Sequence, residues 1–110
     1  MKLPNSERAV VEIEKLVDYC LNPDHPRGKH KARVFRAACG LTQQHADDVR
    51  QQLLDIAVQY EALESPRTAH GRRYVIECRL TGPTGQAVVV TAWIIRDSED
   101  FPRFVSAYVV

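Results

Sequence analysis

The chain has 110 residues, 45% of them hydrophobic and 26% charged, and its formal net charge is +1 at pH 7. This length suits one domain, spanning residues 1–110, and is too short for two. The composition is that of an ordinary globular protein and excludes a disordered or fibrous chain. Because the chain is nearly neutral, affinity for nucleic acid would require a local cluster of basic residues.

The sequence predicts a cytoplasmic protein without a membrane partner. No apolar run is long enough to cross a bilayer, and no early apolar run with a basic flank indicates a signal peptide. Cys20, Cys39 and Cys78 are widely spaced, odd in number and without a CxxC pattern. Such cysteines are typical of reduced thiols.

Apolar residues at helical spacing predict a first helix within residues 6–23. Its stripe consists of Val10, Ile13, Leu16, Val17 and Cys20. Asn22 and Pro23 end the element. Two starts fit the pattern: a helix that begins near Ser6, or a short strand at residues 9–12 that leads into a helix from about Ile13.

Two more helices are predicted after the loop at residues 22–31. The first ends at Gly40, a favourable C-terminal glycine, and its apolar stripe consists of Ala32, Phe35, Ala38 and Cys39. Thr42 is a suitable N-cap for the next helix. That helix has apolar residues in steps of three and four, which predicts one buried face: Ala46, Val49, Leu53, Ile56, Tyr60 and Leu63.

From residue 71 the apolar period changes to two, which predicts strands. Residues 72–80 alternate, the segment TGPTG (residues 81–85) is typical of a turn, and residues 86–96 are apolar on both faces, as in a central strand. Residues 103–110 follow a second turn as the last strand. The expected fold is α+β, with about three N-terminal helices packed on a C-terminal antiparallel sheet of three to four strands.

One face of the central strand is expected to be open. If Val88, Val90, Ala92 and Ile94 face the helices, the outward residues are Val89, Thr91, Trp93 and Ile95. Thr91 and Trp93 would then form a ligand platform, or the face is covered by the N-terminal segment or a partner. Ser106 and Tyr108 are expected on one strand face with Phe104. That face joins the platform or enters the core, depending on register.

The loop NPDHPRGKHK (residues 22–31) brings basic residues to a helix start, where the helix dipole disfavours cations. The basic residues are Arg27, Lys29, His30, Lys31, Arg33 and Arg36, of which the helical spacing puts three on one face: Lys29, Arg33 and Arg36. Gly28 permits a close approach to the backbone, and free N–H groups at a helix start bind anions. A phosphate is therefore the expected guest, and a solvated basic face is the alternative.

Histidine is the side chain whose unperturbed charge change lies near neutrality, and this loop contains His25 and His30. Either could act as a general base beside a phosphate, or have a structural role. His45 and His70 are expected on the surface. No metal and no cofactor are expected, because no cysteine–histidine series has a common zinc spacing and no glycine-rich phosphate loop occurs.

Three segments carry a resemblance to known proteins: KLVDYCLNPDHPRGKHKARVF (15–35), CGLT (39–42) and VVVTAWIIRDSEDFPRFVSAYV (88–109). They resemble an uncharacterised bacterial domain family with the signature KL..Y.LNP.HP.G.HKA.VF. Its members are small proteins beside a short partner gene, or C-terminal modules of toxin-like or phage-associated chains. The matching residues are Lys15, Leu16, Tyr19, Leu21, Asn22, Pro23, His25, Pro26, Gly28, His30, Lys31, Ala32 and Phe35. More distantly, the order of elements is similar to the barnase/EndoU/colicin/RelE-like ribonuclease toxins.

The resemblance implies a metal-independent ribonuclease toxin of a toxin–antitoxin or related conflict system, with an RNA substrate and a small antitoxin protein encoded nearby. The implied catalytic residues are His30, Lys31 and His25. The implied substrate-binding residues are Arg33, Thr91, Arg103, Ser106 and Tyr108, to which the basic helix start adds Lys29 and the expected platform adds Trp93. Lys29, Lys31 and Arg33 would hold the scissile phosphate. His30 or His25 would take the proton of the 2′-hydroxyl, and Trp93 or Tyr108 would stack a base.

The alternative is a non-catalytic protein-interaction module. In that interpretation the basic helix start recognises an acidic partner, and the open sheet face pairs with it. The exposed platform and the sheet edges would also support a homo-oligomer.

Overall fold

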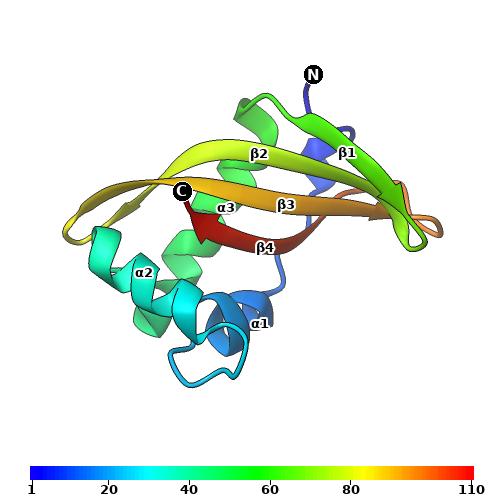
Figure 1. Cartoon of the computed structure of the whole chain (residues 1–110). Coiled ribbons are helices and arrows are strands. Elements are labelled where there is room, and N and C mark those ends of the chain that lie inside the picture. Colours follow the sequence, from blue (N-terminus) through cyan, green and yellow to red (C-terminus); the bar gives the residue numbers. More distant parts are fainter.

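In the computed structural model, which describes residues 1–110, helices precede an antiparallel sheet (Figure 1). The helical elements are η1 (Ser6–Arg8), α1 (Ile13–Lys15), the π-helical turn η2 (Leu16–Cys20), α2 (Lys29–Cys39), η3 (Gln43–His45) and α3 (Ala46–Gln59). The strands are β1 (Leu63–Thr68), β2 (Gly71–Gly82), β3 (Gly85–Arg96) and β4 (Arg103–Val109), in the order β1-β2-β3-β4. The predicted α+β fold is confirmed. No helix combines the length and the apolar composition needed to span a membrane.

The N-terminal segment follows the second of the two predicted starts. Val10 lies beside the first residues of β4, where its N–H donates to Pro102 O (2.9 Å) and its carbonyl accepts from the Phe104 N–H (2.9 Å). The helix then begins at Ile13. The third helix is shorter than predicted, because Tyr60 is already extended (ψ 152°). Leu63, predicted on the buried helix face, is instead exposed at the start of β1.

The predicted glycine end of α2 is confirmed, whereas Thr42, predicted as the N-cap of the next helix, caps the turn η3 directly before α3. Gly40 ends α2 in the left-handed region (φ 77°), and its N–H donates to Arg36 O (2.9 Å). Thr42 begins the next turn, where its N–H donates to Nδ1 of His45 (3.0 Å). His45 was expected on the surface, but it is half-buried and closes this turn.

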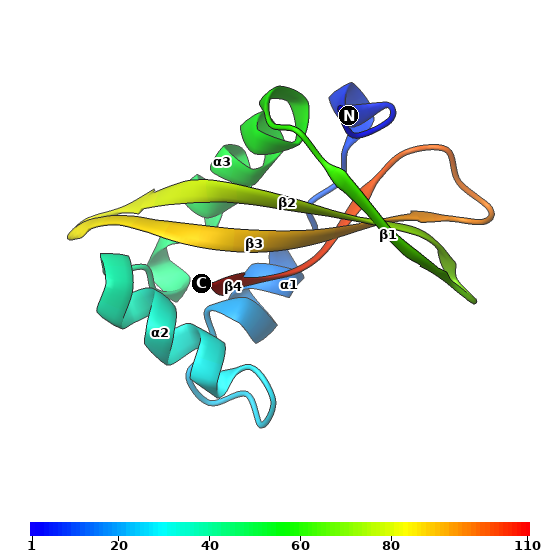
Figure 2. The same cartoon turned by 45° about the horizontal axis from the view of Figure 1, so that its top comes forward.

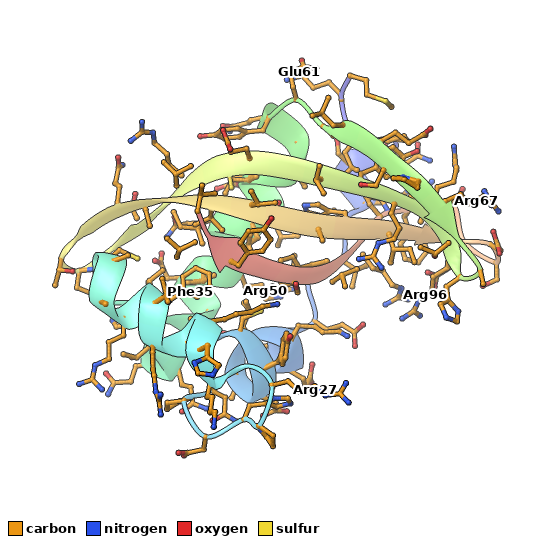
Figure 3. The ribbon with its side chains drawn as sticks, viewed as in Figure 1. Arg27, Phe35, Arg50, Glu61, Arg67 and Arg96 are labelled. Atoms are coloured by element: carbon orange, nitrogen blue, oxygen red, sulfur yellow. The ribbon has the colours of Figure 1, made fainter.

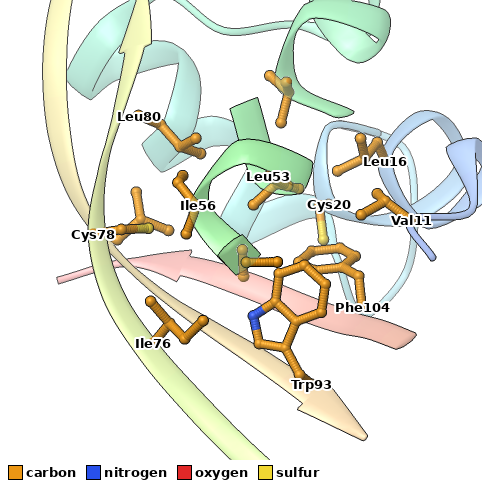
Figure 4. Packing of buried hydrophobic residues seen from close by; sticks show 14 of the residues in the cluster. Val11, Leu16, Cys20, Leu53, Ile56, Ile76, Cys78, Leu80, Trp93 and Phe104 are labelled. Atoms are coloured by element: carbon orange, nitrogen blue, oxygen red, sulfur yellow. The ribbon is translucent and has the colours of Figure 1, made fainter. Parts of the chain in front are cut away.

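The helices cover one side of the sheet and enclose a single core of 24 buried residues. Helix α3 contacts β2, α2 contacts β3 and β4, and α1 contacts β4 (Figures 1 and 2). At the centre, the Trp93 and Phe104 rings pack edge to face with centroids 5.6 Å apart (Figure 4). The hydroxyl of Thr91 donates to Ile76 O (3.0 Å) and accepts from Nε1 of Trp93 (2.9 Å).

The expected outward face of β3 was wrong. Thr91 and Trp93 are completely buried, and the residues that face away from the helices are Val88, Val90, Ala92 and Ile94. Because β3 is apolar on both faces, its composition cannot decide which face is covered. The pairing with β2 decides it: Trp93 lies opposite Tyr74, and Thr91 lies opposite Ile76, both on the buried face of β2.

Strand β4 contains a bulge that breaks the alternation of its side chains. Phe104 pairs with Trp93 and Ser106 pairs with Ala92, so Val105 is an extra residue without a partner. As a result Phe104 and Ala107 are both buried, while Ser106 is half-buried. The expectation that Ser106 and Tyr108 share a face with Phe104 was therefore wrong.

Candidate functional site

Lys31 is held between a tyrosine and a serine at the free edge of β4. Its Nζ donates to Tyr19 Oη (3.2 Å) and to Ser106 Oγ (3.3 Å), and lies 4.9 Å from the centroid of the Tyr19 ring. The ion pairs of the protein involve other cations, so no carboxylate neutralises this ammonium group. A half-buried, anchored and unpaired cation can bind an anion at a fixed position.

Three segments bring this group together. Tyr19 belongs to η2, Lys31 to the first turn of α2, and Ser106 to the bulge of β4. Gly28 allows the first two to meet, since a Cβ at this position would lie 2.5 Å from Tyr19 O. The third, Ser106, lies directly after the extra residue of the bulge and opposite Ala92, where its Oγ accepts from Lys31.

His25 caps the turn that leads into α2. Its Nδ1 accepts from the N–H groups of Arg27 (2.9 Å) and Gly28 (2.9 Å), and its carbonyl accepts from the Lys29 N–H (3.0 Å). These bonds assign the ring hydrogen of the neutral form to Nε2. Three of the N–H groups around this helix start, those of Arg27, Gly28 and Lys29, are therefore already taken up by His25 and are not available to a phosphate.

A groove of about 600 Å³ lies beside this cluster. Tyr19, His25 and Ser106 line it, together with Val105. Its charged residues are of both signs: the cations Lys15 and Arg27, and the carboxylates Glu12, Glu14 and Asp18. Figure 3 shows Arg27 in the loop that precedes α2. The groove thus combines unpaired cations, a phenol and carboxylates, the groups that acid–base chemistry on a phosphate requires.

Arg103 was expected to bind substrate, but it is occupied by carboxylates. It donates to both carboxylate oxygens of Glu99 (2.8 Å each) and to Glu12 Oε1 (3.3 Å). The hydrogen bonds from Arg103 lower the pKa of the Glu99 carboxyl below its ordinary value of 4.5. This pair fastens the loop before β4 and leaves no free donor fork for a ligand.

The remaining predicted residues lie apart from the groove. His30 is exposed on α2 without a hydrogen-bond partner, and Tyr108 is exposed on the outward sheet face. Helix α2 does bring Lys29, Arg33 and Arg36 onto one face. Arg33 and Arg36 line another hollow, of about 460 Å³, which shares no residue with the groove. Thr91 and Trp93 belong to the core.

Of the ten predicted site residues, the fold thus brings three together: His25, Lys31 and Ser106. Sequence reasoning missed Tyr19, Lys15 and the carboxylates of the groove. Tyr19 and Lys15 belong to the signature, but Ser106, which lines the same groove, lies near the other end of the chain. The signature therefore gives no sign that these residues meet. No three His, Cys, Asp or Glu side chains gather in a way that could hold a metal ion.

The comparisons with known proteins give a family without an activity. No curated protein matches the sequence. One family model, described as "Domain of unknown function (DUF6883)", matches residues 2–110. Since this match covers nearly the whole chain, the protein belongs to the DUF6883 family.

Proposed function

We propose that the protein is a metal-independent endoribonuclease and the toxin of a toxin–antitoxin or related conflict system. The observation that carries this proposal is the unpaired ammonium of Lys31, anchored by Tyr19 and Ser106 beside a groove that contains carboxylates. RNA fits such a site because its own 2′-hydroxyl is the nucleophile, so the protein has to supply only charge stabilisation and proton transfer.

In the proposed reaction the 2′-oxygen attacks the adjacent phosphorus and the bond to the 5′-oxygen breaks. The products are a 2′,3′-cyclic phosphate and a 5′-hydroxyl. Lys31 binds a non-bridging phosphate oxygen, where negative charge develops. Glu14 or Asp18 accepts the proton of the 2′-hydroxyl. The Tyr19 hydroxyl accepts from Lys31, so its own hydrogen is free to go to the leaving oxygen.

These roles differ from those expected from the sequence. His25 becomes a positioning residue, because its Nδ1 is engaged by two backbone N–H groups. His30 has no role, because it lies outside the groove. Of Lys29, Lys31 and Arg33, which were expected to hold the phosphate together, only Lys31 keeps this role. Lys15 and Arg27 line the groove nearby.

The proposal predicts that Lys31→Met abolishes most RNA cleavage by the purified protein. Removal of one charge-stabilising donor costs roughly a hundredfold to a thousandfold in rate. Lys29→Met is the matched control, because it removes the same charge from the same helix turn, and it should cleave nearly as fast as the wild type. EDTA should leave cleavage unchanged. Cleavage by Lys31→Met at the wild-type rate would remove the proposed site.

In cells, induction of the wild-type protein should arrest growth, and the product of the neighbouring gene should relieve the arrest. The proposed site of action is the cytoplasm, where the RNA substrate is found. Lys31→Met should be tolerated on induction.

A second candidate function, a non-catalytic interaction module, is favoured by the outward sheet face. Val75, Val88, Val90, Ala92 and Ile94 are half-buried there, and the helices pack on the other side. Tyr108 and Leu63 extend this apolar surface, with exposed fractions of 49% and 72%. Intact RNA in the cleavage assay, together with binding to the neighbouring gene's product, would favour this function over the ribonuclease. Self-association through this face would appear as a dimer in sedimentation.

A further inference from the structure

A basic hollow of about 530 Å³ lies where the turn between β1 and β2 meets the loop after β3. Its cations come from three different elements: Lys15 from α1, Arg73 from β2 and Arg96 from the end of β3. His70, in the β1–β2 turn, is at its rim. Figure 3 shows Arg96 at the end of the sheet next to that turn.

The cations of this hollow are not neutralised by the protein. Lys15, Arg73 and Arg96 take part in none of its ion pairs. The hollow has one carboxylate, Asp97, and that carboxylate is already paired with Arg67. An anion bound in the hollow would therefore interact with cations that no carboxylate of the protein contacts directly.

The hollow adjoins the proposed catalytic groove. Lys15 and Val105 line both of them, so Lys15 stands at the junction. Val105 is the extra residue of the β4 bulge, whose neighbour Ser106 binds Lys31. The other basic hollow, which contains Arg33 and Arg36, has no lining residue in common with the groove.

The hollow also offers an apolar surface. Ile94 and Val105 are half-buried and contribute to its wall. Cations over an apolar patch suit a nucleotide, whose phosphate is anionic and whose base presents a flat, weakly polar face. An isolated inorganic anion would not need this apolar wall.

We infer that this hollow, formed by Lys15, Arg73 and Arg96, is a second RNA subsite, which binds the phosphate of a nucleotide next to the cleaved bond. The inference rests on the proposed function for the role of the groove. It assigns to the protein a single-stranded RNA substrate longer than a dinucleotide, because a dinucleotide has one internucleotide phosphate, the cleaved one, and no second phosphate for the hollow.

The test is equilibrium binding of fluorescein-labelled 2′-O-methyl oligoribonucleotides, which lack the nucleophilic hydroxyl and are not cleaved. The probes are a dinucleotide and an octanucleotide. The variants are Arg73→Gln/Arg96→Gln and the matched control Arg33→Gln/Arg36→Gln, which removes the same charge from the unconnected hollow. Affinity is measured by fluorescence anisotropy over a range of salt concentrations.

Arg73→Gln/Arg96→Gln should weaken octanucleotide binding by roughly tenfold. The slope of the logarithm of the binding constant against the logarithm of the salt concentration should become shallower by about 0.7 for each phosphate that the variant no longer neutralises. Dinucleotide binding should not change. The control variant should bind both probes like the wild type. Equal losses of affinity in the two double variants would overturn the subsite, since they would indicate only diffuse attraction. Unchanged octanucleotide binding would also overturn the subsite and would favour an acidic protein as the occupant of the basic hollow.

The outcome is independent of the cleavage assay. If Lys31→Met abolishes cleavage while Arg73→Gln/Arg96→Gln binds the octanucleotide normally, the function stands and the subsite fails. If the wild type binds the octanucleotide through Arg73 and Arg96 but cleaves no RNA, the hollow stands as an RNA-binding site and the ribonuclease fails.

Discussion

Thr91 is the one polar or charged side chain that the core buries completely. Its hydroxyl joins two strands and a ring: it donates to Ile76 O on β2 and accepts from the indole N–H of Trp93. The indole N–H has no other partner inside the apolar core, where an unpaired donor is costly. The residue that the sequence suggested as part of a ligand platform is therefore a structural link.

Thr91→Val keeps the shape of this side chain and removes its hydroxyl. We expect the free energy of unfolding to fall by about 1–3 kcal/mol, because the buried Trp93 N–H loses its partner. Urea unfolding followed by Trp93 fluorescence measures this change. Thr84→Val is the control, because Thr84 is exposed and its hydroxyl makes no hydrogen bond. A Thr91→Val protein as stable as the wild type would contradict this role of the hydroxyl.

At the scale of elements, the contact between η2 and the start of α2 determines where Lys31 lies. Gly28 is buried against Tyr19, and the same helix turn brings the Lys31 ammonium to the Tyr19 hydroxyl. The other end of α2 is fixed by Gly40, whose positive φ ends the helix against Thr84. The two glycines thus have separate roles. Gly28 allows the start of α2 to pack closely on η2, and Gly40 ends α2.

Gly28→Ala would bring a Cβ to 2.5 Å from Tyr19 O, so the first turn of α2 must move. We expect both the stability and the RNA cleavage to fall, because Lys31 moves with this turn. Gly40→Ala should lower the stability by about 1 kcal/mol or more, through backbone strain and through the close approach of its Cβ to the Thr84 side chain (3.0 Å). Cleavage is compared at a temperature where both variants are folded. Equal cleavage by the two variants would show that the position of the first turn does not matter.

At the scale of the whole molecule, salt bridges tie the N-terminal residues to distant segments. Arg8 pairs with Asp100 (2.9 Å), and the N-terminal amine pairs with Glu61 (2.7 Å). Hydrogen bonds in these pairs lower the pKa of the Asp100 and Glu61 carboxyls below their ordinary values of 3.8 and 4.5. With Glu99, which Arg103 binds, three carboxylates are stabilised in the ionised form.

These lowered pKa values predict that the protein loses stability in acid. In the unfolded chain the three carboxyls protonate at their ordinary values, so at pH 3–4 the unfolded state binds more protons than the folded state. The stabilisation of the folded protein by these three ionised carboxylates is complete above about pH 5, and it is lost as the pH falls through the pKa values of the folded state. Urea midpoints at pH 7, 5 and 3 measure it. Glu99→Gln should flatten the pH dependence, whereas Glu77→Gln, which removes an exposed carboxylate outside the ion pairs, should not.

The fold could be predicted from the sequence because its signals are local. Periods of three to four and of two mark the helices and strands, and Gly40 and Thr42 mark two of their ends. The site could be predicted only in part, because it depends on register and on one irregularity. Nothing in β3, apolar on both faces, reveals that Trp93 points inward, and nothing in β4 reveals that Val105 is an extra residue. The link between Tyr19, Lys31 and Ser106 follows from those two facts.

The bulge in β4 also allows the strand to hold one more residue without changing the faces of its neighbours. With Val105 as the extra residue, Phe104 lies opposite Trp93, Ser106 opposite Ala92 and Ala107 opposite Thr91. Deletion of Val105 would give a regular strand with the same three pairings, so Ser106 would keep its direction. Among related sequences, position 105 should therefore vary more, in residue type and in presence, than the positions of Phe104, Ser106 and Ala107.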